Sequence, residues 1–131
     1  MGELLYSSTR GGETGCTASE AVLKGLAKDG GLFMPERIPR FDFALPELKD
    51  ASYQEVAYRV MRLLLTDYSE EELRTCIEGA YDEKFDTPEI APLTFADDAY
   101  YLELFHGKTI AFKDMALSIL PYLMTTAAKK N

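Results

Sequence analysis

Three helix-start signals constrain the fold of this chain more than any other feature of its sequence. Each signal is a capping box, in which a Ser or Thr hydroxyl and a Glu three residues later cover free backbone amides. The boxes lie at residues 17–20, 52–55 and 69–72. Apolar residues recur at helical spacing after each box, which predicts helices over 18–27, from 53 onward and up to about residue 81. The Asp-Gly-Gly sequence at 29–31 is expected to end the first helix.

Short strands are predicted on both sides of this helical block. Residues 4–10 and 32–35 are expected to be extended. The loop that begins at Pro35 runs to about residue 50 and also contains Pro39 and Pro46. Another loop, with Pro88 and Pro92, precedes the aromatic-rich segment 100–105, which is typical of a strand. Because these strands are few and short, the sheet content is expected to be small.

A last helix is predicted over residues 115–129. Asp114 is expected to cap it, and Pro121 is expected to kink it or to free one carbonyl group. The longest apolar run, 119–124, contains that proline and is far too short to span a bilayer. Helices and strands in this order indicate an α+β fold.

Composition excludes several classes of function. The chain has 131 residues, 14 Lys and Arg, 22 Asp and Glu and a formal net charge of −8, so nucleic acids and anionic membranes are not expected partners. Two cysteines, Cys16 and Cys76, have no metal-binding spacing and no disulfide framework, which favours reduced thiols in a cytoplasmic protein. The first residues lack the basic start and apolar core of a signal peptide.

The segment with the clearest chemistry is residues 103–114, ELFHGKTIAFKD. It places Lys113 between the loop after a strand and the start of a helix, beside Ile110, Phe112 and Met115. Apolar surroundings favour loss of the ammonium proton, which a lysine nucleophile requires. The alternative is a surface lysine whose stem lies along an apolar face.

This segment resembles the active-site motif of the threonine synthases, ELFHGPTxAFKD, in which x is variable. Lys108 is the one departure, because the family has proline there. Further blocks that agree in the family's order lie at residues 6–11, 20–35, 52–57, 80–85 and 92–93. The resemblance therefore covers nearly the whole chain.

The resemblance implies a fold and a cofactor. Lys113 is expected to bind pyridoxal 5'-phosphate through an imine, with Phe112 beside it. Residues 1–95 are expected to be the family's N-terminal domain, and 96–131 the first strand and helix of a fold-type II pyridoxal-phosphate domain. The phosphate-holding Gly-rich loop of such domains does not occur between Lys113 and residue 131. The chain is thus expected to be an N-terminal fragment that does not hold the cofactor firmly.

The implied reaction converts O-phospho-L-homoserine and water to L-threonine and phosphate, with the fragment alone inactive. Ser8, Thr9 and Arg10 are candidates for binding the anionic substrate, with a simple turn as the alternative. His106 is a further candidate, with a structural hydrogen-bonding role as the alternative. Lys108 is expected either to loosen the loop or to add charge near the substrate phosphate.

Two other functions stay open at this stage. One is a related pyridoxal-phosphate lyase that acts on phosphohomoserine without making threonine. The other is a stand-alone helical module that binds a partner. Apolar residues around the lysine segment would then be exposed and favour self-association; these are Phe105, Ile110, Phe112 and Leu120.

Overall fold

All three predicted helix-start signals begin a helix in the computed structural model, which describes residues 2–131. The helices are α1 (Ala18–Lys24), α2 (Tyr53–Leu64) and α3 (Glu70–Ala80). Complete capping boxes form at Thr17 and Ser69. At α2 the Ser52 hydroxyl accepts from the Glu55 amide, as predicted. The Glu55 carboxylate, however, binds Arg59 and Arg74 instead of the Ser52 amide.

The predicted end of the first helix was wrong. It ends at Lys24, three residues before 27, because Gly25 adopts a φ of 69° that few side chains tolerate. The chain then reverses, and Leu26 forms a bridge with Leu32. The Asp-Gly-Gly sequence at 29–31 turns this reversal rather than ending the helix.

The strands form two separate antiparallel pairs. β1 (Tyr6–Ser8) pairs with β2 (Phe33–Pro35), both within the predicted segments but shorter. A 3-10 helix (Leu45–Leu48) lies in the long loop that follows. The second pair is a hairpin of β3 (Leu93–Ala96) and β4 (Ala99–Leu102).

The hairpin corrects the sequence prediction in two ways. β3 was expected to belong to a loop, and β4 was expected to reach residue 105. The turn between the strands is Asp97-Asp98, and both residues have a positive φ. Tight hairpin turns require that conformation, and Asp tolerates it better than most residues.

The last predicted helix is two helices, α4 (Asp114–Leu117) and α5 (Leu120–Lys130). Pro121 lies in the first turn of α5, where its missing amide costs nothing, so the chain breaks before the proline instead of kinking at it. The prediction of one continuous helix over 115–129 was therefore wrong, because α4 ends at Leu117 and α5 begins at Leu120.

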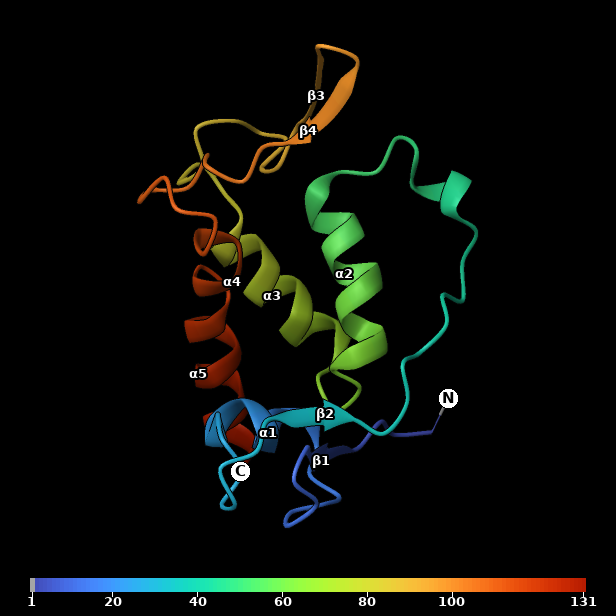
Figure 1. Cartoon of the computed structure of the whole chain (residues 1–131), viewed down its shortest axis with the longest axis vertical. Helices are drawn as coiled ribbons and strands as arrows, with labels where there is room; N and C mark the ends of the chain where they lie inside the picture. The colour runs from blue at the N-terminus through green and yellow to red at the C-terminus, as the bar shows by residue number, and fades with distance from the viewer. Residues whose placement is uncertain (1) are drawn as a thin grey trace.

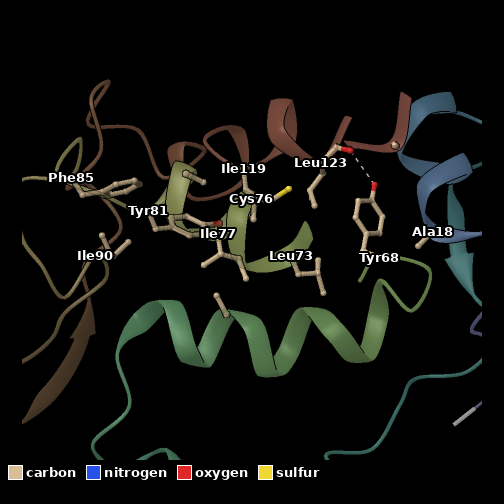
Figure 2. Close-up of a cluster of buried hydrophobic side chains, with 13 residues drawn as sticks. Ala18, Tyr68, Leu73, Cys76, Ile77, Tyr81, Phe85, Ile90, Ile119 and Leu123 are labelled. Atoms are coloured by element: carbon tan, nitrogen blue, oxygen red, sulfur yellow. Dashed lines mark hydrogen bonds between the residues drawn. The ribbon is translucent and has the colours of Figure 1, made fainter. Parts of the chain in front are cut away.

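The core lies between α2, α3 and the C-terminal helices. Figure 1 shows α3 between α2 and α5, and Figure 2 shows the side chains that fill this space. Leu73 and Ile77 of α3 are fully buried, and the Tyr68 hydroxyl donates to the Leu123 carbonyl of α5 at 3.1 Å. At the far end of α5, the Asn131 amide donates to the Ser19 hydroxyl of α1 at 2.9 Å.

The proposed domain boundary between residues 95 and 96 falls inside β3. α5, from the second of the two parts, packs against α1 and α3 of the first. The division into two domains of a longer protein stays a prediction. Among residues 2–131, no helix combines the length and the apolar character needed to cross a membrane.

Candidate functional site

Lys113 is exposed and directly precedes α4, as the sequence predicted for its place between loop and helix. Its ammonium nitrogen lies 4.3 Å from the centre of the Phe112 ring, a cation–π contact. Ile110 is 71% exposed and Phe112 is 63% exposed. The predicted apolar enclosure of the amine was therefore wrong for Ile110, which is mostly exposed.

Lys113 lines an open hollow of about 490 Å³. The hollow brings together the start of α2, the end of the hairpin and α4, through Tyr53, Leu102 and Met115. Its walls are almost wholly apolar, and Lys113 is the one lining residue with a charge. A primary amine beside apolar walls fits the aldehyde and ring of pyridoxal phosphate, while the groups that hold its phosphate must come from outside this hollow.

Asp114 holds the turn that precedes it. Its side chain is buried, and its two carboxylate oxygens accept from the Thr109 amide at 2.8 Å and from the Thr109 hydroxyl at 2.6 Å. The prediction that Asp114 caps the helix was wrong, because no side-chain cap bond forms at α4. Gly107 lets the two segments approach, since a Cβ there would lie 2.5 Å from the Asp114 Cβ.

A buried tyrosine anchors the other side of α4. The Tyr81 hydroxyl donates to the Met115 carbonyl at 2.6 Å, and burial raises the pKa of that hydroxyl. The ring of Tyr81 also packs edge-on against Tyr53, whose centroid is 4.9 Å away. The backbone just after Lys113 is thus fixed to the core at Met115 and joined to Thr109 through Asp114.

His106 lies between two carboxylates. Its Nε2 is 2.6 Å from Glu103, and its Nδ1 contacts Asp86 in the segment that follows α3. The Asp86 amide also donates to the His106 carbonyl at 3.0 Å. Hydrogen bonds to Glu103 and, to a lesser degree, to Asp86 raise the pKa of His106. The contacts with Asp86 also connect the start of the lysine segment to the segment that follows α3.

Ser8, Thr9 and Arg10 bind the loop before β2. The Ser8 hydroxyl donates to Asp29 at 2.7 Å, the Thr9 hydroxyl accepts from the Leu32 amide, and the Arg10 guanidinium donates to the Asp29 carbonyl. β1 and the hairpin lie at opposite ends of the molecule (Figure 1). The structure therefore does not bring these three residues together with Lys113.

Sequence reasoning missed two partners at these sites, Asp86 and Asp29. Asp29 also accepts from the Gly12 and Gly31 amides, and its hydrogen bonds with Ser8 and these amides lower the pKa of its carboxyl. An Asp directly before Gly-Gly is typical of such a turn. Asp86 carries no comparable local signal, since its partner His106 is 20 residues away.

The comparison with known proteins settles the family. The family model described as "Threonine synthase N terminus" matches residues 5–81. The chain belongs to the threonine synthase family. Threonine synthase from Schizosaccharomyces pombe is 44% identical over 90% of this chain, and that from Pseudomonas aeruginosa is 39% identical over 96%.

Solved threonine synthases share the fold. A structure described as pyridoxal-phosphate-bound threonine synthase from Brucella melitensis aligns with 97% of this chain, with a TM-score of 0.86 and 32% identity. Threonine synthase from Escherichia coli aligns with 95%, with a TM-score of 0.75 and 27% identity. This chain spans about a quarter of the length of these relatives, 24% and 27% of the two sequences and 28% of each structure.

Other parts of the molecule offer less for an anionic cofactor or substrate. A second hollow, of about 630 Å³, is lined by Asp82, Glu83 and Asp86, whose charges repel anions. Within the described residues, no group of three or more His, Cys, Asp or Glu side chains is arranged to hold a metal ion. Both cysteines, Cys16 and Cys76, are buried free thiols, as predicted.

Proposed function

We propose that this chain is the N-terminal part of a pyridoxal-phosphate-dependent threonine synthase that converts O-phospho-L-homoserine and water to L-threonine and phosphate. The observation that carries the proposal is the place of Lys113, an exposed amine at the start of α4 beside an apolar hollow. It lies in a segment that differs from the family motif only at Lys108. The membership of the family and the cofactor named for the Brucella relative support the proposal.

Two residues of the segment, Lys113 and Phe112, have a proposed part in the chemistry. The cofactor, when bound, supplies an electron sink for the carbanion formed at the substrate Cα. The Lys113 nitrogen would hold the cofactor and, when free of it, would carry protons between substrate carbons. Phe112 covers one side of that nitrogen. Substrate binding by Ser8, Thr9, Arg10 and His106 stays a prediction.

The rest of the active site is proposed to come from the remainder of the catalytic domain. The hollow beside Lys113 contains no second cation, so a phosphate group needs donors from another part of the protein. The 131 residues alone are therefore expected to bind pyridoxal phosphate weakly and to be inactive.

The test replaces Lys113 in the longer enzyme. We expect Lys113→Ala to lower threonine formation by more than about a thousandfold, because the covalent attachment and the proton carrier are lost together. Lys129→Ala is the matched control, since Lys129 is exposed at the end of α5 and remote in sequence from the motif. Threonine formation at the normal rate in the Lys113 variant would end the proposal.

Product analysis of the same enzyme separates the two chemical alternatives. A threonine synthase releases phosphate and threonine in equal amounts. A related lyase releases phosphate without threonine, and that result would replace the proposed reaction while keeping the role of Lys113.

A further inference from the structure

We infer that Asp114 is a positioning residue, whose buried carboxylate closes residues 107–114 into a fixed turn and so directs the Lys113 amine to the hollow beside α4. The inference deepens the proposed function and rests on Lys113 being the cofactor-binding residue. Asp114 does not line the hollow beside Lys113, and its described side-chain hydrogen bonds go to Thr109 and not to the Lys113 nitrogen.

Asp114 is not a surface acid: together with Thr109 and Gly107 it forms a closed contact, here called the clasp, that joins the two ends of the turn. Asp114 is only 7% exposed, and its two carboxylate oxygens accept hydrogen bonds from the amide and the hydroxyl of Thr109. The loss of a hydrogen-bond partner in a buried site is costly. The carboxylate therefore has a single described task, which is to hold the start of the turn against the start of α4.

The backbone conformation of the turn indicates that surrounding contacts hold it in place. Ile110 has a φ of 66°, a left-handed conformation that a β-branched side chain adopts only when surrounding contacts enforce it. Gly107 leaves no room for a side chain because the Asp114 side chain fills that place. The two ends of the turn are thus packed together, with Ile110 at its exposed middle.

Lys113 lies between Thr109 and Asp114, the two residues that these hydrogen bonds join. The Asp114 carboxylate fixes the chain directly after Lys113, and the bond from Tyr81 to the Met115 carbonyl fixes it one residue further on. A reactive group that is misplaced by about 1 Å can lose on the order of a hundredfold in rate. Releasing the turn is therefore expected to misplace the amine without removing it.

The first experiment measures how selectively the amine reacts. The 131-residue chain is incubated with pyridoxal phosphate, reduced with borohydride, and the labelled lysines are mapped by mass spectrometry. Label on Lys113 is expressed relative to label on the exposed Lys28, an internal reference in the same sample. We expect Asp114→Ala to lower this ratio on the order of tenfold.

A conservative variant separates positioning from charge. In Asp114→Asn the amide oxygen can still accept from the Thr109 amide, and the amide nitrogen can donate to the Thr109 hydroxyl. We expect this variant to restore most of the labelling ratio. If Asp114→Asn were as poor as Asp114→Ala, the negative charge and not the clasp would matter, which would overturn the inference.

Two further pairs of variants loosen the same clasp from its other members. Gly107→Ala is expected to displace Asp114, with Gly2→Ala as control, because a Cβ at Gly2 meets nothing within 4 Å. Thr109→Val removes the hydroxyl, with Thr125→Val as control, because the Thr125 hydroxyl binds only its own helix at Pro121. Both clasp variants should lower the ratio, and neither control should.

Hydrogen exchange provides a measurement that needs no cofactor. We expect the Thr109 amide to exchange about tenfold faster in Asp114→Ala, while the amides of α3 keep their wild-type rates. An unchanged Thr109 rate overturns the inference, and so does a faster rate with an unchanged labelling ratio. If the wild-type chain shows no preference for Lys113, the turn does not direct the amine and the inference is overturned, whereas Lys113→Ala in the longer enzyme still decides the proposed cofactor role.

Discussion

The helical block and the region from β3 to α4 use similar apolar side chains in opposite ways. In α3, Leu73 is 1% exposed and packs inside the core. In β3, Leu93 is 61% exposed, although its neighbours Pro92 and Phe95 are apolar. The block can bury its apolar face within the chain, whereas the hairpin and the lysine segment have no such face to pack against. Apolar periodicity thus predicts an element, and its burial depends on what else is available.

The first way to break this comparison is to truncate the same residue type in each region. We expect Leu73→Ala to lower the free energy of unfolding by about 2–5 kcal/mol, because it leaves a cavity in the core. Leu93→Ala is the matched variant and should change it by no more than about 0.5 kcal/mol. Urea unfolding followed by circular dichroism measures both, and equal losses would show that the hairpin is packed as tightly as α3.

The second test concerns what the exposed region does in solution. Phe95 and Tyr100 form an exposed aromatic pair on the hairpin, with centroids 4.9 Å apart. We expect the 131-residue chain to self-associate through this region, and the double variant Phe95→Ser, Tyr100→Ser to weaken that association by roughly tenfold to a hundredfold. Sedimentation velocity measures it.

Ile38→Ser is the control for this experiment, because Ile38 is exposed in the loop after β2 and not on the hairpin. A monodisperse wild-type monomer across the concentration range would contradict the prediction. It would also weaken the alternative of a stand-alone partner-binding module.

The third test concerns the joint between the two regions, where His106 contacts Asp86. The contacts raise the pKa of His106, first through Glu103 and then through Asp86. The protonated form is therefore favoured in the folded state. Its stabilising effect is complete below the unfolded value of about 6.5 and is lost as pH rises through the raised folded value.

We expect the wild-type protein to exceed His106→Gln in stability at about pH 6, and the difference to shrink as pH rises. Thermal unfolding across pH measures the difference, and an NMR titration of the imidazole checks the direction of the pKa shift. A difference that grew with pH would show that the neutral form is the favoured one. Glu103→Gln should reduce the shift, since Glu103 is its largest cause.

The smallest effect is expected at Lys108, where the family has proline. No described backbone bond uses the Lys108 amide, and Lys108 is not among the residues with a positive φ. Lys108→Pro is therefore expected to raise stability by about 0.4–1 kcal/mol through the unfolded chain. In the longer enzyme it should also change kcat/KM for phosphohomoserine, and unchanged kinetics would end the proposed role of Lys108.

The sequence predicted those parts of the fold that depend on local signals. The capping boxes located the starts of α1, α2 and α3, and the aromatic run located β4. The end of α1 was misplaced because Gly25, a single residue with a permissive backbone, acted before the more obvious Asp-Gly-Gly sequence. β3 was missed because its turn, Asp97-Asp98, lacks the glycine of the usual hairpin signal.

The site divides in the same way. The place of Lys113 followed from its neighbours in sequence, but the tasks of the residues around it did not. Asp114 resembled a helix cap, and only the fold brings its carboxylate to Thr109. The contact of His106 with Asp86 joins segments 20 residues apart, which no local pattern reports.

The bond between Asn131 and Ser19 joins residues that are 112 positions apart. α1 buries Ala18 and Ser19 and packs against α5, which is synthesised after α2, α3 and the hairpin, so this tertiary partner is missing while those elements are made. Contacts of such long sequence separation slow folding, because a large loop must close before they form. The nascent chain is therefore expected to expose this face of α1 until α5 has emerged.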